Sequence, residues 1–91
     1  MKLHFEKLAS VRTQFIDRVS GPVLRELLDN LLQSGVVTDG EMDSAAGTPT
    51  RAEKARVVID TVRRKGSRAS SVLITALREV DPYLSTEMIN P

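Results

Sequence analysis

The sequence predicts an all-α fold, a six-helix antiparallel bundle that forms one domain over residues 1–91. Apolar residues recur at spacings of three and four along most of the chain, which is the period of one face of a helix. Residues typical of helix starts and ends divide this pattern into short segments with short connections. With 91 residues, of which 41% are apolar, the chain can bury a core of its own.

Two apolar stripes predict the first two helices. The first runs over about residues 2–19 and ends at Ser20-Gly21, with Leu8, Val11, Phe15 and Val19 on its inner face. Pro22 suits the first turn of the second helix, which ends at Ser34-Gly35. Its stripe consists of Leu24, Leu27, Leu28, Leu31 and Leu32. We expect Glu26, Asp29 and Gln33 on the opposite, solvent side.

Capping residues predict where the other helices begin. Thr38-Asp39-Gly40-Glu41 and Thr50-Arg51-Ala52-Glu53 are capping boxes that start the third and fourth helices. The third is short and ends before Gly47, and the fourth ends at Lys65-Gly66. Ser67 is expected to cap the fifth helix, and Asp81-Pro82 to start the sixth. The predicted inward residues are Met42 and Ala45, then Ala55, Val58, Ile59 and Val62, then Ala69, Val72, Leu73, Ala76, Leu77 and Val80. The sixth helix carries Tyr83, Leu84 and Met88. Leu28, Ile59 and Leu73 should be nearly fully buried.

The composition argues against catalysis. The chain has no cysteine and one histidine, His4, which excludes thiol chemistry and zinc or iron–sulfur sites built on cysteine. Ser67, Ser70 and Ser71 have no base to activate them, and Glu41 and Glu53 already have capping roles. We therefore expect no enzyme activity, no metal and no cofactor. Apolar runs are too short to span a membrane and the start lacks a signal peptide, so we expect a soluble, cytoplasmic protein.

The charges are segregated along the chain although the net charge is only +1. Residues 1–25 have a net charge of +3, residues 26–50 of −5, residues 51–68 of +5 and residues 69–91 of −2. Arg56 and Arg63, two turns apart, share one flank of the fourth helix. Solvated surface explains any single charge. Two opposite patches on one small domain instead favour head-to-tail association with copies or relatives of the same domain.

Two alternative functions remain open at this stage. A small helical nucleic-acid-binding domain could use the basic segment 51–68, but the chain offers few aromatic side chains for stacking on bases. A regulatory domain of an enzyme is the other alternative. Loss of acidic residues should strengthen binding to nucleic acid, whereas it should damage a protein-interaction domain that uses both patches.

The order of several segments resembles a caspase recruitment domain. These segments are Phe15-Ile16-Asp17-Arg18, Leu27-Leu28-Asp29-Asn30-Leu31-Leu32, Val36-Val37-Thr38-Asp39-Gly40-Glu41-Met42, Lys54-Ala55-Arg56-Val57-Val58-Ile59-Asp60, Lys65-Gly66 and Asp81-Pro82-Tyr83-Leu84. The likeness covers nearly the whole chain and is greatest to the prodomains of inflammatory caspases and their small decoy relatives. It implies the six-helix death fold and no catalysis.

The resemblance also implies partners and contact residues. Such domains join proteins in innate immune and cell-death signalling, by contact with the same domain in a caspase, adaptor or sensor, and they assemble into homo-oligomers or helical filaments. A basic surface from the first and fourth helices docks on an acidic surface from the second and third. By position, the basic residues are Arg12, Lys54, Arg56 and Arg63, and the acidic residues are Glu26, Asp29, Glu41 and Asp43. We call these sets the basic patch and the acidic patch.

Overall fold

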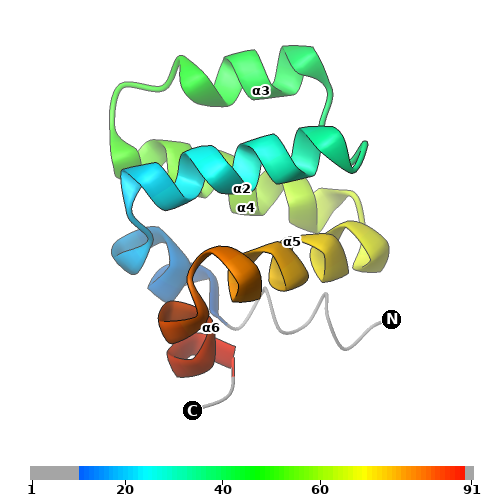
Figure 1. Cartoon of the computed structure of the whole chain (residues 1–91). Coiled ribbons are helices and arrows are strands. Elements are labelled where there is room, and N and C mark those ends of the chain that lie inside the picture. The colour runs from blue at the N-terminus through cyan, green and yellow to red at the C-terminus, as the bar shows by residue number, and fades with distance from the viewer. Residues whose placement is uncertain (1–10, 90–91) are drawn as a thin grey trace.

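The structure is a computed structural model that describes residues 11–89. These residues form six helical segments and no strand: residues 11–18, α2 (Gly21–Gln33), α3 (Asp39–Ala46), α4 (Arg51–Arg64), α5 (Ser67–Val80) and α6 (Pro82–Ile89). In Figure 1, α2 lies in front of α4, α3 lies above them, and α5 and α6 lie below. The predicted all-α fold is confirmed. Residues 2–10 of the predicted first helix lie outside the described residues, and its described part ends at residue 18.

The core forms where the helices turn their apolar stripes toward α5. This helix packs against α2, α4 and α6. Leu28, Ile59 and Leu73 are 5%, 0% and 1% exposed, as predicted. Leu84 and Met88 of α6 are also buried, whereas Tyr83 is exposed. Because α3 contributes only one buried apolar side chain, Ala45, it is the helix least supported by the core.

The helix ends follow the predicted caps with two exceptions. The hydroxyl of Thr38 accepts from the backbone N–H of Glu41, whose carboxylate accepts from the backbone N–H of Thr38, a complete capping box. Thr50 caps α4 in the same way, but the Glu53 carboxylate accepts from the Thr50 hydroxyl instead of the backbone. That box is therefore only half formed.

The prediction that Ser67 caps α5 is wrong. The residue before the helix is Gly66, with φ of 100° and ψ of −166°, a conformation that only glycine adopts readily. The turn out of α4 uses this glycine, so Ser67 falls inside the first turn of α5. Gly35 has a φ of 76° just after α2, which is the expected glycine at a helix end.

Polar contacts fix residues 11–18 against the bundle. The guanidinium of Arg51 donates from Nη1 to the carbonyl oxygens of Ile16 and Val19, at 2.6 and 2.8 Å. These carbonyls lie at a helix end, where the helix has no partners of its own for them. Arg18 pairs with Glu87 of α6. Together with the burial of Val11, Phe15 and Ile16 in the core, these contacts hold residues 11–18 alongside α4.

Candidate functional site

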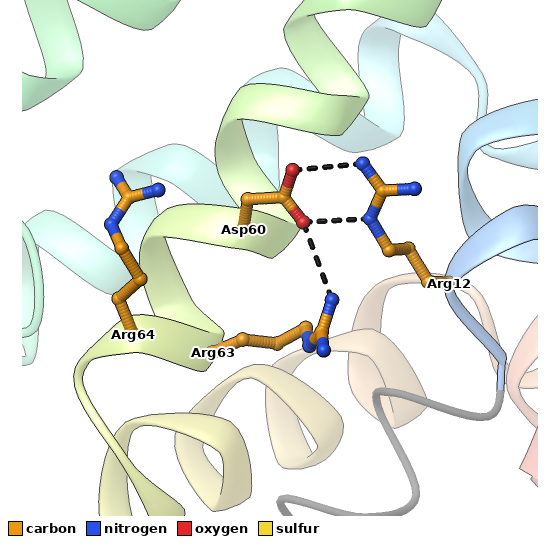
Figure 2. Close-up of a pocket in the computed structure, with 4 residues that line it drawn as sticks. All are labelled: Arg12, Asp60, Arg63 and Arg64. Atoms are coloured by element: carbon orange, nitrogen blue, oxygen red, sulfur yellow. Dashed lines mark hydrogen bonds and ion pairs between the residues drawn. The ribbon is translucent and has the colours of Figure 1, made fainter.

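A pocket of about 450 Å³ lies between residues 11–18 and α4. The described residues that line it are Arg12, Asp60, Arg63 and Arg64. In Figure 2, Arg12 reaches across to Asp60, Arg63 approaches the same carboxylate from the next turn of α4, and Arg64 points away from it. The structure thus brings together two members of the predicted basic patch, Arg12 and Arg63, around an acidic residue.

The carboxylate of Asp60 accepts two hydrogen bonds from Arg12, from Nε at 2.7 Å and from Nη2 at 2.8 Å. Nη1 of Arg63 lies 3.5 Å from the same carboxylate. The hydrogen bonds from Arg12, together with the nearby positive charges, hold the pKa of Asp60 below its ordinary value despite partial burial. Asp60 is therefore an anion at neutral pH, held by two arginines.

Arg56 shares this flank of α4, but Lys54 does not. Arg56 is exposed, and at about 100° per residue it lies within about 20° of Arg63 around the helix axis. Lys54 lies about 160° from Arg56 by the same geometry. Val57 and Thr61, on the side of α4 that carries Lys54, line a second pocket against α3. Three residues of the basic patch, Arg12, Arg56 and Arg63, thus lie on one flank, and the fourth, Lys54, is separated from them.

Glu26 and Asp29 occupy the outer face of α2. Leu24, Leu27, Leu28 and Leu31 bury the other face of this helix, which leaves both carboxylates exposed. Neither has an ion pair with any residue within 11–89. Two predicted members of the acidic patch are therefore accessible to another molecule.

The two residues of α3 in the predicted acidic patch, Glu41 and Asp43, differ in their surroundings. Asp43 is exposed. Glu41 is half-buried, and its Oε1 lies 2.8 Å from the ammonium of Lys65 and 2.9 Å from the backbone nitrogen of Thr38. The hydrogen bond from Lys65, followed by that from Thr38, lowers the pKa of Glu41. Because its charge is already paired, Glu41 is less available than Asp43 or Asp29.

Residues 11–89 contain no group of three or more acidic or histidine side chains that could hold a metal ion together. None of the helices in that range has the length and apolar character needed to cross a membrane. Two charged surfaces of opposite sign lie on different helices of this all-α domain, an arrangement typical of the class of domains that bind other proteins.

The comparison with known families agrees with this class. The pattern that defines the caspase recruitment domain matches residues 5–90, so this chain belongs to the caspase recruitment domain family. It is 42% identical to caspase-1 of Rattus norvegicus over 79 residues, which cover 86% of this chain and 20% of that protein. It is 35% identical to caspase recruitment domain-containing protein 18 of Homo sapiens over 82 residues, which cover 89% of this chain and 91% of that protein.

The chain spans about a fifth of the caspase-1 relatives that it matches. No solved structure matches it. The family is a protein-interaction module of caspase and inflammasome signalling, whose members bind other caspase recruitment domains in caspases and adaptors. The predicted family and fold are therefore confirmed. The general function of this family is binding between domains of the same kind.

Sequence reasoning missed Asp60 and Arg51 as organisers of the basic flank. The spacing of Asp60 and Arg63, three residues apart on one helix, is a visible sign of an ion pair. The contacts of Arg12 with Asp60 and of Arg51 with Ile16 join residues 48 and 35 positions apart. No local pattern in the sequence encodes such contacts.

Proposed function

We propose that this domain recruits signalling proteins in the cytoplasm by docking its basic patch on the acidic patch of a second caspase recruitment domain, and that repetition of the contact builds a helical filament. The observation that carries the proposal is the separation of the charges. Arg56 is exposed on α4, and Asp29 is exposed on α2 without an ion pair to any residue within 11–89. Each can therefore meet the opposite charge on another molecule.

A contact between two different surfaces does not close a symmetric dimer. Each subunit that joins uses one patch and still offers the other, so the assembly keeps one unused patch of each sign at its two ends, the contact repeats and an open helix forms. The same surfaces can join two different members of the family, which is the contact needed for recruitment. Caspase-1 and caspase recruitment domain-containing protein 16 are relatives with such a domain, and a caspase, adaptor or sensor is the proposed partner.

Charge reversal on each patch tests the proposal. Asp29→Arg and Arg56→Asp should each leave the monomer helical and abolish polymerisation, because one reversed patch interrupts growth at every subunit. A mixture of the two variants retains one intact patch on each molecule, so limited pairing should return. Light scattering and electron microscopy at low salt measure assembly, and circular dichroism measures helicity.

Glu79→Arg and Arg78→Asp provide matched controls. Both positions are exposed on α5, and both substitutions make the same changes in net charge outside the two patches. The controls should assemble like the unmodified chain. Folded Asp29→Arg and Arg56→Asp variants that also assemble normally would show that the patches are only solvated surface. Stronger binding to duplex DNA by Asp29→Arg, with unchanged self-assembly, would favour the nucleic-acid alternative instead.

A further inference from the structure

We propose that Asp60 is an internal competitor within the basic patch, and that its carboxylate raises the concentration at which the domain associates with an acidic partner. The inference rests on the proposed function, because it concerns regulation of the same surface. Asp60 places a negative charge within this positively charged surface. A surface that only attracts carboxylates from a partner would not need a carboxylate of its own.

Asp60 occupies the arginine atoms best suited to bind a carboxylate. The guanidinium group has a fork-shaped edge formed by Nε and one Nη, which matches the two oxygens of a carboxylate. In Arg12 both atoms of this edge donate to Asp60, at 2.7 and 2.8 Å. A carboxylate from another protein is left with the outer Nη atoms of Arg12. It must share this guanidinium with Asp60 or displace it.

The same carboxylate also acts on Arg63. Nη1 of Arg63 lies 3.5 Å from Asp60 Oδ1, while its Nε is buried and has no hydrogen-bond partner among the described residues. Asp60 thus draws one end of this guanidinium without satisfying the whole group. An incoming carboxylate that bonded to Arg63 would also have to overcome the repulsion of the Asp60 charge.

The charges lining the pocket give the direction of the effect. Among the described residues that line the pocket, Arg12, Arg63 and Arg64 supply three positive charges and Asp60 one negative charge, a balance of +2 that would be +3 without Asp60. The side chains of Arg12, Asp60 and Arg63 are 33%, 28% and 30% exposed. They are accessible to a partner but partly shielded from solvent ions, so their interactions are screened less than those of fully exposed charges. Removal of the Asp60 charge should therefore favour an acidic partner.

Asp60 also orients Arg12, and this second effect has the opposite sign. Asparagine removes the negative charge completely but the orienting contact only in part, because it keeps one of the two oxygens that accept from Arg12. If the charge dominates, Asp60→Asn should associate more readily than the unmodified chain. If orientation dominates, the variant should associate less readily.

The test measures the threshold concentration for assembly by light scattering for the unmodified chain and for Asp60→Asn, with helicity checked by circular dichroism. Glu79→Gln is the control, since it removes one negative charge from an exposed position on α5. Asp60→Ser is measured in parallel, so that a neutral variant is available if Asp60→Asn loses helicity. A further comparison is made between Arg12→Gln and Arg12→Gln/Asp60→Asn.

Asp60→Asn should lower the threshold by about three- to tenfold, and Glu79→Gln should leave it unchanged. The effect of Asp60→Asn should be smaller when Arg12 is already glutamine. An unchanged or higher threshold in a folded neutral variant overturns the inference, as does an equal decrease in Glu79→Gln. These outcomes are distinct from failure of the proposed function, in which Arg56→Asp and the unmodified chain would assemble alike or not at all.

Discussion

The ammonium of Lys65 lies 2.8 Å from Oε1 of Glu41, and this ion pair joins the end of α4 to the beginning of α3. It matters because Ala45 is the only buried apolar side chain of α3. The same carboxylate completes the capping box with Thr38. Glu41 therefore attaches α3 to the bundle, which is a structural role for a residue that the charge pattern places in the acidic patch.

Acid should destabilise the domain through three paired carboxylates. Hydrogen bonds from Lys65, Arg12 and Arg18 lower the pKa of Glu41, Asp60 and Glu87, respectively. A lowered pKa in the folded state contributes stability above the unfolded pKa, about 4, and this contribution is lost as the pH falls through the folded pKa. We expect a nearly constant melting temperature between about pH 7 and 5, and a decrease below about pH 4.

Asp60→Asn tests the expected decrease in melting temperature at low pH. The variant should melt below the unmodified chain at neutral pH and show a shallower decrease at low pH, because one of the three titrating groups is gone. Thermal unfolding followed by circular dichroism gives both curves. Parallel curves would mean that Asp60 has the same pKa in the folded and unfolded chain, contrary to its contacts with Arg12.

Leu73→Ala should cost about 2–5 kcal/mol in the free energy of unfolding. Leu73 is 1% exposed and lies on α5, which packs against α2, α4 and α6, so the lost side chain leaves a cavity shared by several helices. Thr75→Ala, at an exposed position of the same helix, should change the free energy of unfolding by less than about 0.5 kcal/mol. Denaturant titration measures both. Equal midpoints for the two variants would contradict a central position of α5.

Arg51→Ala should loosen residues 11–18 more than the rest of the domain. The substitution removes hydrogen bonds from a charged donor to the carbonyls of Ile16 and Val19, a loss of about 1–3 kcal/mol. Hydrogen exchange should increase mainly in residues 11–18, and Arg51→Lys should show a smaller increase. Arg78→Ala, on exposed α5 surface, is the control. If exchange in Arg51→Ala increased no more in residues 11–18 than in the rest of the domain, other contacts would hold this segment.

The sequence was sufficient to predict the helices because their causes are local. The leucine stripe of α2, the Thr38–Glu41 box and the glycine after α2 act within a few residues of one another. Ser67 failed as a cap because the decisive residue was its neighbour Gly66, whose positive φ belongs to the turn between two helices. Serine is a good cap by type, but this turn geometry left it inside the helix.

The site was predicted less completely because pairing between distant residues decides which charges are free. Charge segregation and helical spacing indicated the flank with Arg56 and Arg63. They could not show that Asp60 binds Arg12, or that Lys65 pairs with Glu41. Helical spacing places Lys54 on the other side of α4 from Arg56. The net charge of residues 51–68 does not show this separation, because it counts charges without regard to the side of the helix.

The different surroundings of Asp29 and Glu41 give the last prediction. Asp29 is exposed and has no ion pair within residues 11–89, so its charge is available to a partner. If a partner's arginine desolvates it, Asp29→Asn should weaken association by about thirtyfold to several thousandfold, since truncation of such a pair costs about 2–5 kcal/mol. Sedimentation or fluorescence titration against a second caspase recruitment domain measures the dissociation constant.

Glu41→Gln is the matched neutralisation, and it should weaken association by less than about fivefold. Its charge is already balanced by Lys65, and glutamine can still accept from the backbone of Thr38, so the capping box survives. Lys65→Gln/Glu41→Gln should behave like Glu41→Gln alone, because the two residues act on each other. If Glu41→Gln weakened association as much as Asp29→Asn, a partner would have to take Glu41 from Lys65, and the acidic patch would extend onto the ion pair that attaches α3.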